Sequence, residues 1–452
     1  MNINRLNNIF FLGIGGIGMS ALARYFHARG VNVSGYDKTP SSITNALQQE
    51  GIQIWFEDQE NIIPENLDLV VYTPAVPKNT VLFNGLESRN IPMMKRAELL
   101  GLITNDMKTV AIAGTHGKTT ISTIIAHILK TGGIKTTAFL GGISVNYQTN
   151  FLSEEPSEWA VVEADEFDRS FLQLKPDIAL VSAMDADHLD IYGSESALIE
   201  SFREFVKRIK ADGTLVIKKS LEGKLDFPGE TLTYDCEGPA AFMARESEVK
   251  NGKFYTALDG MIKTPQFELG FPGHHNLENA LGAAAIAWRM GMDSITIMNA
   301  LNTFRGVKRR FEICYQGPAA VYIDDYAHHP EEIKACIKAT RLLYSGKKIT
   351  AIFQPHLFSR TRDLAEQFSE SLGLADAVWM LDIYPARELP IEGVHAEMLL
   401  EKIDLKEKFL IRKGEVLETL EKNPPEVLLT MGAGDIDRLV PDIVEFLKRK
   451  AL

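Results

Sequence analysis

The residues best suited to chemistry form a glycine-rich stretch, Gly114-Thr-His-Gly-Lys-Thr-Thr120. Gly114 and Gly117 allow a turn tight enough for backbone N–H groups to face an anion. Lys118 adds a positive charge for the β- and γ-phosphates of a nucleotide, and Thr119 offers a hydroxyl to Mg²⁺. The predicted phosphate-binding residues are Gly114, Thr115, His116, Gly117, Lys118, Thr119 and Thr120.

The elements around this loop favour the nucleotide interpretation over an incidental lysine in a glycine-rich turn. The strict pattern requires a glycine five residues before Gly117, where this chain has Ile112. The apolar run 110–113 nevertheless predicts a buried strand before the loop. Apolar residues recur at helical spacing after it, which predicts a helix that packs one face on a sheet: Ile121, Ile124, Ile125, Ile128 and Leu129.

Carboxylates follow the next predicted strands. The strand 159–162 runs into Glu163-Ala-Asp-Glu-Phe-Asp168, and the strand 178–181 leads to Asp185-Ala-Asp-His-Leu-Asp190. Mg²⁺ prefers oxygen ligands, often one or two carboxylates together with phosphate. His188 either caps a local turn or serves a metal, and the acidic residues around it favour the metal.

A second glycine-rich loop, Gly13-Ile-Gly-Gly-Ile-Gly18, follows the predicted strand 9–12, and Asp37 ends the next strand. This pattern is typical of dinucleotide binding, although its glycines serve any nucleotide diphosphate, including a UDP-sugar. Asp37 is either a ribose ligand or a solvated carboxylate. Thr73 begins a loop at a strand end, and Arg96 belongs to a basic pair that either contacts phosphate or is solvated.

The third part of the chain, from residue 320, again alternates strands and helices, which predicts a doubly wound parallel sheet. Polar residues gather after its strands in 324–329 and 354–362. His328 and His329 would face opposite ways in extended chain, so at least one is expected to be structural. Asn276 and Asn279 either read a base or cap the helix 280–290.

Composition limits the class of protein. A length of 452 residues suggests roughly three domains. The net charge, 48 − 60 = −12, argues against a nucleic-acid surface. Three cysteines without metal-type spacing indicate reduced thiols. No apolar run reaches membrane-spanning length, and the glycines within 9–23 fit a loop better than the secretory signal that this stretch imitates.

The expected fold class is α/β with three domains. Residues 1–103 are predicted to form a Rossmann-like domain. Residues 104–312 are predicted to form a P-loop ATPase domain with a mostly parallel sheet and a small β portion over 212–272, and residues 313–452 a second Rossmann-like domain.

Taken together, these motifs resemble the Mur ligase family. The resemblance covers essentially the whole chain. It rests on the two glycine loops, Glu163-Ala-Asp-Glu166, Asp187-His-Leu-Asp190, His275-Asn276, Val307-Lys-Arg-Arg-Phe-Glu312, Asp324-Asp-Tyr326, His328-His-Pro330, Phe353-Gln-Pro-His356 and Met431-Gly-Ala-Gly-Asp-Ile436.

The resemblance implies a role for each candidate residue. The implied catalytic residues are Lys118, His328 and Arg360. Besides the phosphate loop, the implied ATP-binding residues are Asn276, Asn279, Arg310 and Asp325. The implied UDP-sugar residues are Gly13, Gly15, Gly16, Gly18, Asp37, Thr73 and Arg96. Tyr326, His328 and Arg360 would bind the amino acid, and Thr119, Glu163 and His188 two Mg²⁺ ions.

The implied reaction uses ATP to join L-alanine to the lactyl carboxylate of UDP-N-acetylmuramate through an acyl phosphate, for peptidoglycan precursor synthesis in the bacterial cytoplasm. The segments 171–175 and 356–360 favour L-alanine over a preformed tripeptide. Phe202 stands where other members carry a carbamylated lysine, and Leu357 where some carry a basic residue. A monomer or weak homodimer without nucleic-acid or membrane partners is expected. An NAD(P)-dependent oxidoreductase or a regulatory ATPase module are the alternatives.

Overall fold

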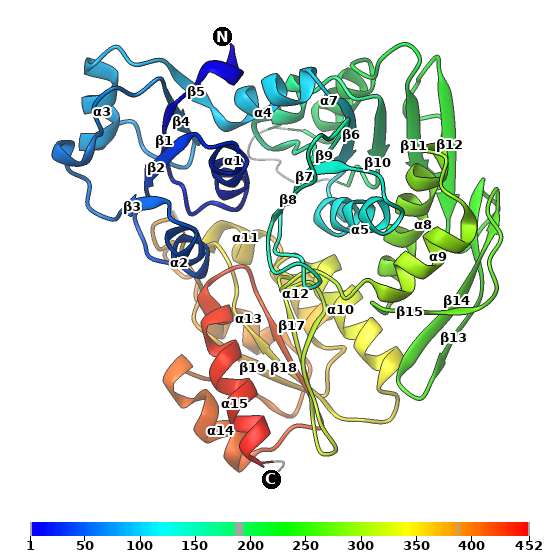
Figure 1. Ribbon diagram of the computed structural model, residues 1–452. Helices are drawn as coiled ribbons and strands as arrows, with labels where there is room; N and C mark the ends of the chain where they lie inside the picture. The colour runs from blue at the N-terminus through cyan, green and yellow to red at the C-terminus, as the bar shows by residue number, and fades with distance from the viewer. Residues whose placement is uncertain (1, 186–191, 193, 387, 451–452) are drawn as a thin grey trace. The chain divides into compact units, whose positions relative to one another are not determined.

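The computed structural model describes residues 2–185, 192, 194–386 and 388–450. The chain folds into two compact units. The first unit contains Met1–Arg245, Leu258–Pro265 and Glu278–Thr303, and the second unit contains Glu246–Ala257, Gln266–Leu277 and Phe304–Leu452. Within the described ranges the strands form three sheets, and no helix there is long and apolar enough to cross a membrane (Figure 1).

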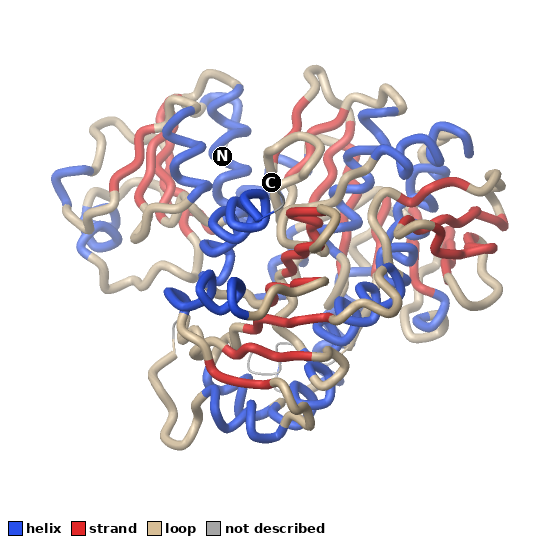
Figure 2. The backbone as a smooth tube through the Cα atoms, turned by 90° about the horizontal axis from the view of Figure 1, so that it is seen from below, coloured by secondary structure: helices blue, strands red, loops and turns tan. Residues whose placement is uncertain are grey.

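The first sheet has the order β3-β2-β1-β4-β5, and its strands pair in parallel. Ile9 and Phe11 of β1 belong to one hydrophobic core, while Phe10 and Leu12 belong to another, because successive side chains of a strand point to opposite faces. Helices accordingly lie on both sides of these strands in Figure 2. The elements are β1 (Asn8–Leu12), α1 (Ile17–Ala28), β2 (Asn32–Tyr36), α2 (Ser42–Gln49), β3 (Gln53–Trp55), β4 (Leu69–Tyr72), α3 (Val81–Ser88), β5 (Met93–Lys95) and α4 (Arg96–Asn105).

The second sheet has the order β15-β14-β13-β12-β11-β10-β6-β9-β7-β8. Its strands from β7 to β13 pair in parallel in that order. The predicted irregular β portion over 212–272 contains the strands β11 to β15. The elements are β6 (Lys108–Ala113), α5 (Lys118–Thr131), β7 (Thr136–Phe139), β8 (Phe151–Ser153), β9 (Trp159–Glu163), β10 (Ile178–Val181), α7 (Glu195–Val206), β11 (Thr214–Lys218), β12 (Glu230–Asp235), β13 (Phe242–Lys250), β14 (Lys253–Gly260), β15 (Phe267–Leu269), α8 (His274–Arg289) and α9 (Ser294–Thr303).

The third sheet, in the second unit, has the order β16-β17-β21-β18-β19-β20 and is parallel except for β16. Two short helices after β18 are separated at Leu364, where φ is −114° and ψ is 20°. The elements are β16 (Glu312–Gln316), β17 (Val321–Asp325), α10 (Pro330–Leu343), β18 (Ile349–Phe353), α11 (Phe358–Asp363), α12 (Ala365–Leu372), β19 (Ala377–Met380), α13 (Ala396–Lys402), β20 (Lys408–Leu410), α14 (Val416–Lys422), β21 (Val427–Met431) and α15 (Val440–Lys450).

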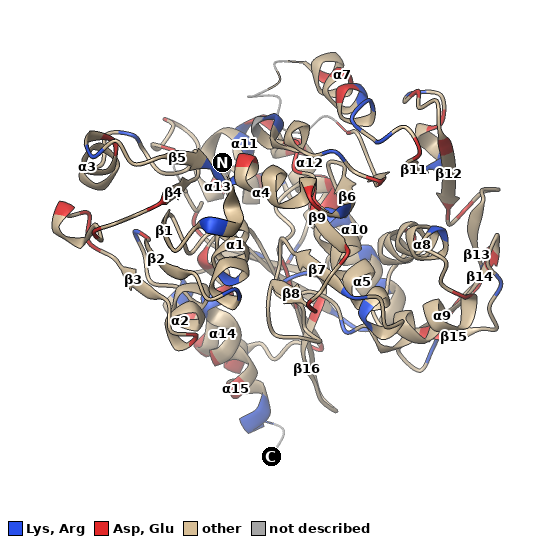
Figure 3. Ribbon diagram, turned by 45° about the horizontal axis from the view of Figure 1, so that its top comes forward, with Lys and Arg blue, Asp and Glu red and all other residues tan. Residues whose placement is uncertain are grey.

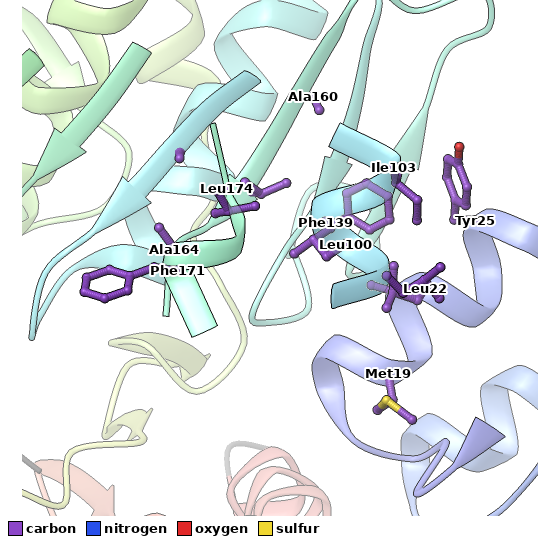
Figure 4. Packing of buried hydrophobic residues seen from close by; sticks show 14 of the residues in the cluster. Met19, Leu22, Tyr25, Leu100, Ile103, Phe139, Ala160, Ala164, Phe171 and Leu174 are labelled. Carbon is purple, nitrogen blue, oxygen red and sulfur yellow. The ribbon is translucent and has the colours of Figure 1, made fainter. Parts of the chain in front are cut away.

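One hydrophobic core joins the first two sheets within the first unit. Figure 4 shows Met19, Leu22 and Tyr25 of α1 beside Leu100 of α4 and Phe139 of β7. The Tyr25 and Phe139 ring centroids lie 5.4 Å apart. This shared core fixes the two glycine-rich loops relative to each other, since each loop follows a central strand of its sheet.

The predicted α/β class is confirmed. Acidic and basic residues are interspersed over the helices and strands in Figure 3.

Candidate active site

The phosphate loop lies between β6 and α5, as predicted. Gly114 and Gly117 have φ angles of +130° and +84°, which disfavour other residue types. A Cβ atom on Gly114 would lie 2.2 Å from Ser182 Oγ. Ile112, at the position where the strict pattern has glycine, is a fully buried residue of β6. The strand therefore continues through this position, and the turn begins only at Gly114.

Lys118 is the first residue of α5, and its ammonium group points back across the loop. Its Nζ donates to Gly114 O at 2.7 Å and to both carboxylate oxygens of Glu166 at 2.8 Å. Burial alone would lower the pKa of Lys118, but the charges of Glu166 and Asp165 raise the pKa above its usual value. Lys118 is therefore held as a cation beside the loop.

Glu163 ends β9, which pairs with β6, so its carboxylate reaches the start of α5. It accepts hydrogen bonds from Gly141 N at 2.8 Å, from Ser122 Oγ at 3.2 Å and from the Thr119 hydroxyl. Burial raises the pKa of Glu163, while the Lys118 charge opposes that rise. Two of the predicted metal ligands are thus in contact.

The third predicted metal ligand, His188, lies outside the described residues. The described part of the chain contains no cluster of three His, Cys, Asp or Glu side chains suited to a metal. The oxygen pair of Thr119 and Glu163 nevertheless fits Mg²⁺, which typically takes few protein ligands and completes its coordination with phosphate and water.

The predicted UDP-sugar residues surround the first glycine loop. Gly13 has φ +82°, and a Cβ atom there would lie 3.1 Å from Thr73 Cγ2. A Cβ atom on Gly18 would lie 3.1 Å from the guanidinium of Arg96, which begins α4. Gly16 is the N-cap of α1.

Asp37 lies against this loop. Its carboxylate accepts Gly15 N at 2.8 Å and Thr39 N at 3.2 Å. It therefore braces the loop backbone, a role that neither sequence interpretation of Asp37 included.

A cavity of about 180 Å³ extends from the first glycine loop to the end of β9. Its walls include Ile17 and Gly18 of the loop and helix α1, Arg96, and the two carboxylates Glu163 and Asp165. A molecule held by its diphosphate at the glycine loop would therefore have room to direct another group toward Glu163.

Behind the cavity wall, Asn150 connects α1 to the second sheet. Its side chain is fully buried, and Nδ2 donates to Ile17 O at 2.6 Å and to Ser20 Oγ at 2.9 Å. Asn150 Oδ1 accepts from Arg24, which also binds Glu50. Asn150 O accepts from Leu140 N at 2.9 Å, next to the Gly141 amide that holds Glu163.

The two candidate base-binding asparagines have different surroundings. In the second unit, Asn276 Nδ2 donates to Pro272 O at 2.8 Å, a contact with the chain just before α8. In the first unit, Asn279 Oδ1 lies 2.6 Å from where a Cβ atom on Gly117 would be. Asn279 is therefore next to the phosphate loop, while the Asn276 amide contacts the chain just before α8.

The second unit brings the predicted amino-acid residues together. The guanidinium groups of Arg309 and Arg310 each lie 5.1 Å from the centre of the Tyr326 ring. The His328 ring lies 5.1 Å from Tyr326, and its Nδ1 is 2.9 Å from Tyr326 O. Burial lowers the pKa of His328, and the nearby Arg360 charge lowers it further. A lowered pKa favours the neutral form of the His328 ring, which is the form that can accept a proton.

The remaining predicted residues of this cluster have structural contacts. His329 is the N-cap of α10, and Glu332 accepts its backbone N–H at 3.2 Å. Asp325 accepts Phe311 N at 2.6 Å and Ala327 N at 2.7 Å, and burial raises the pKa of Asp325 to about 7. Asp325 thus holds the turn that carries Arg309 and Arg310.

Three features of the site carried no signal of their own in the sequence. Glu166 belongs to the acidic run 163–168, but that run alone gives no reason to pair it with Lys118. Asn150 and Gly141 lie in a stretch without a motif. Phe202, at the position where other members of the family carry a lysine, packs against Phe171 with ring centroids 5.4 Å apart, which fills the position with apolar contacts.

Comparisons with known proteins agree with this architecture. Three family models match: the Mur ligase family catalytic domain over residues 8–108, the Mur ligase middle domain over 112–287 and the Mur ligase glutamate ligase domain over 309–436.

Full-length relatives bear the same enzyme name. UDP-N-acetylmuramate–L-alanine ligase of Flavobacterium psychrophilum is 48% identical over 459 residues, covering 100% of both chains. Its Flavobacterium johnsoniae counterpart is 46% identical over 456 residues, covering 99% of both. The crystal structure of UDP-N-acetylmuramate-alanine ligase from Thermotoga maritima matches with a TM-score of 0.84 at 27% identity, covering 98% of this chain and 99% of that one. The predicted membership is confirmed: the chain belongs to the Mur ligase family.

Proposed function

We propose that the protein is an ATP-dependent ligase that joins L-alanine to the lactyl carboxylate of UDP-N-acetylmuramate and releases ADP and phosphate. The observation that carries this proposal is the cavity that extends from Ile17 and Gly18 of the first glycine-rich loop to Glu163, whose carboxylate contacts Thr119 of the phosphate loop. A diphosphate-type loop at one end of a cavity, and at the other end a carboxylate that contacts a triphosphate-type loop, suit a reaction in which ATP activates a group on a nucleotide-linked substrate.

The chemistry requires activation because a carboxylate does not acylate an amine in water. Transfer of the γ-phosphoryl group to the lactyl carboxylate gives an acyl phosphate and ADP. The amine of L-alanine then attacks the acyl carbon, and phosphate leaves with the bonding electron pair. The loop amides and Lys118 neutralise charge on the transferring group, which is where such catalysts gain most of their rate.

Thr119 and Glu163 are the described residues that would hold Mg²⁺, and His188 is proposed as a further ligand. When bound, Mg²⁺ neutralises phosphate charge and orients the phosphate oxygens. We propose two ions, in keeping with the family resemblance.

The amino acid is assigned to the cluster of Tyr326, His328 and Arg360. Arg360 would pair with the carboxylate of L-alanine, and His328 would orient its amine. Asn279 and Arg310 are proposed to contact ATP, and the residues around the Gly13–Gly18 loop to hold UDP. The domain limits 1–103, 104–312 and 313–452 are proposed as the boundaries of these three roles. Cys236, Cys314 and Cys336 are free, as a cytoplasmic location would favour.

The test is phosphate release from ATP in the presence of UDP-N-acetylmuramate, with L-alanine, L-serine, glycine or a tripeptide added separately. Release that depends on the sugar nucleotide and is greatest with L-alanine is the expected result. If phosphate release is greatest with the tripeptide, the amine substrate is a preformed peptide and not L-alanine. Absorbance changes at about 340 nm with NAD(P)⁺ and no phosphate release would refute the ligase proposal.

A further inference from the structure

The ammonium group of Lys118 has three N–H donors, and three acceptor oxygens of described residues lie around it. The acceptors are Gly114 O at 2.7 Å and the two carboxylate oxygens of Glu166 at 2.8 Å. A phosphate oxygen can therefore bind Lys118 only if one of these three contacts is given up.

Glu166 is a structured part of this site. Its side chain is 0% exposed and that of Lys118 is 15% exposed, so water screens the pair poorly. The hydroxyl of Tyr192 donates to Glu166 O at 2.6 Å and fixes the backbone of the residue. Glu166 is therefore held in a fixed position beside the ammonium group of Lys118.

Of the two partners, Glu166 is the one that a phosphate can replace. Gly114 O belongs to the backbone of the loop, where Gly114 has a φ of +130° and contacts Ser182, so moving it would deform the loop itself. Glu166 binds through a side chain and uses two oxygens, so it can release one oxygen and keep the other.

We propose that Glu166 is the counter-ion of Lys118 in the absence of nucleotide. When a nucleotide binds, one carboxylate oxygen of Glu166 gives up its Lys118 N–H donor to a phosphate oxygen. The carboxylate keeps the lysine aimed across the loop, and it competes with phosphate for the same N–H donors. Nucleotide affinity is then set below its maximum, and the return of Glu166 to Lys118 assists the departure of ADP. Glu166 acts through Lys118 and is a positioning residue. The proposal depends on the nucleotide role of the loop proposed above.

The competition predicts that removing the charge of Glu166 increases the affinity for ADP. Glu166→Gln keeps the shape of the side chain but removes its charge and one of its two acceptors. The full-length variant should bind ADP roughly tenfold more tightly than the wild type, which corresponds to about 1.4 kcal/mol. A purely structural role for Glu166 would give weaker binding instead, because a damaged loop loses affinity.

Asp165→Asn is the matched control. Asp165 is the neighbouring carboxylate, and its charge also acts on Lys118, but the described hydrogen bonds of Lys118 do not include it. This variant should tighten ADP binding by less than about threefold, since a screened charge without a direct contact contributes little. Glu166→Gln should also have no effect in a Lys118→Met background, because the competition needs the ammonium group.

The experiment is a calorimetric titration of ADP into the wild type, the single variants and the double variant, with thermal melting of each protein recorded first. Tighter binding in Glu166→Gln that disappears in the Lys118→Met background supports the proposal. Unchanged or weaker binding in a folded Glu166→Gln protein overturns it, as does tightening that persists without Lys118.

The experiment also covers a Glu166→Gln variant that does not fold and a wild type that does not bind ADP. If Glu166→Gln does not fold, Glu166→Asp replaces it, since the shorter side chain keeps its charge but cannot place both oxygens on Nζ. It should tighten ADP binding by roughly threefold (about 0.6 kcal/mol), and an unchanged dissociation constant would overturn the proposal. If the wild type itself fails to bind ADP, the proposed function fails, and the role of Glu166 fails with it.

Discussion

Replacing Lys118 by methionine removes the cation of the phosphate loop and leaves a negative charge behind. Methionine has a similar unbranched stem, so the packing of the side chain is largely retained. Glu166, whose side chain is 0% exposed, loses its ionic partner. Breaking a buried ion pair in this way destabilises a protein by about 3–5 kcal/mol. Because burial already raises the pKa of Glu166, the carboxyl group can take up a proton, and we expect the lower end of that range.

The effect on activity has a separate origin and a separate size. Removing one preorganised group that stabilises transition-state charge lowers kcat by roughly 10²–10³-fold. Lys118 carries a full charge, so phosphate release should fall by at least about 10²-fold. A coupled assay of phosphate release with all three substrates measures this, while urea unfolding measures stability.

The double variant Lys118→Met/Glu166→Gln distinguishes the two effects. It removes both charges of the buried pair, so its stability should return to within about 1 kcal/mol of the wild type. Its phosphate release should stay as low as that of the single variant. Wild-type release in either variant would refute the assignment of Lys118 to the transferring phosphate. Unchanged stability in Lys118→Met would refute the importance of the pair in the resting protein.

Three other predictions test different parts of the molecule. Asn150→Ala should lower the stability to urea by about 2–3 kcal/mol, because Ile17, Ser20 and Arg24 all lose a buried partner; equal stability would contradict the link between the sheets. His328→Ala should leave acyl phosphate formation intact, trapped with hydroxylamine, and reduce peptide formation by roughly 10²–10⁴-fold; equal loss of both would exclude a role with the amine. Burial lowers the pKa of His275 to about 4, so the unfolded chain binds more protons between pH 6.5 and 4, and stability falls as pH falls through this window. His275→Asn should remove about 2 kcal/mol of the change in stability between pH 7 and 5, and an unaltered pH profile would show that His275 is not buried as a neutral ring.

Local sequence signals predicted the loops but could not identify most of their partners. Glycine spacing, a preceding β-branched strand and a following helical stripe located the phosphate loop, because each depends on residues only a few positions apart. Arg24 and Asn150 are separated by 126 residues. No periodicity within either segment encodes that contact, since it exists only after two sheets have packed on a shared core.

The sequence also could not decide between the alternative roles of some polar residues. Asp37 was expected to bind ribose or to be solvated, yet its carboxylate accepts the N–H of Gly15 from the loop that it was expected to help bind ligand. Asn276 was expected to read a base or to cap the helix 280–290, and its Nδ2 donates to Pro272 O from within α8, which begins at His274. Residue type specifies how many donors and acceptors a side chain has, while the fold decides which of them are already in use.

The acidic run at the end of β9 shows how the fold gives similar residues different hydrogen-bond partners. Glu163 ends the strand, so the pairing of β9 with β6 directs it to Thr119 and Ser122. Three residues later the chain has left the strand and turned, and Phe171 N donates to Asp165 O across the turn. This turn directs Glu166 to the opposite partner, Lys118. Glu163, beside the Thr119 hydroxyl, is thereby suited to bind a metal ion. Glu166, beside the Lys118 ammonium group, is suited to act as its counter-ion. The same functional group therefore meets different partners in one site, because a strand end and a turn place the two carboxylates against different neighbours.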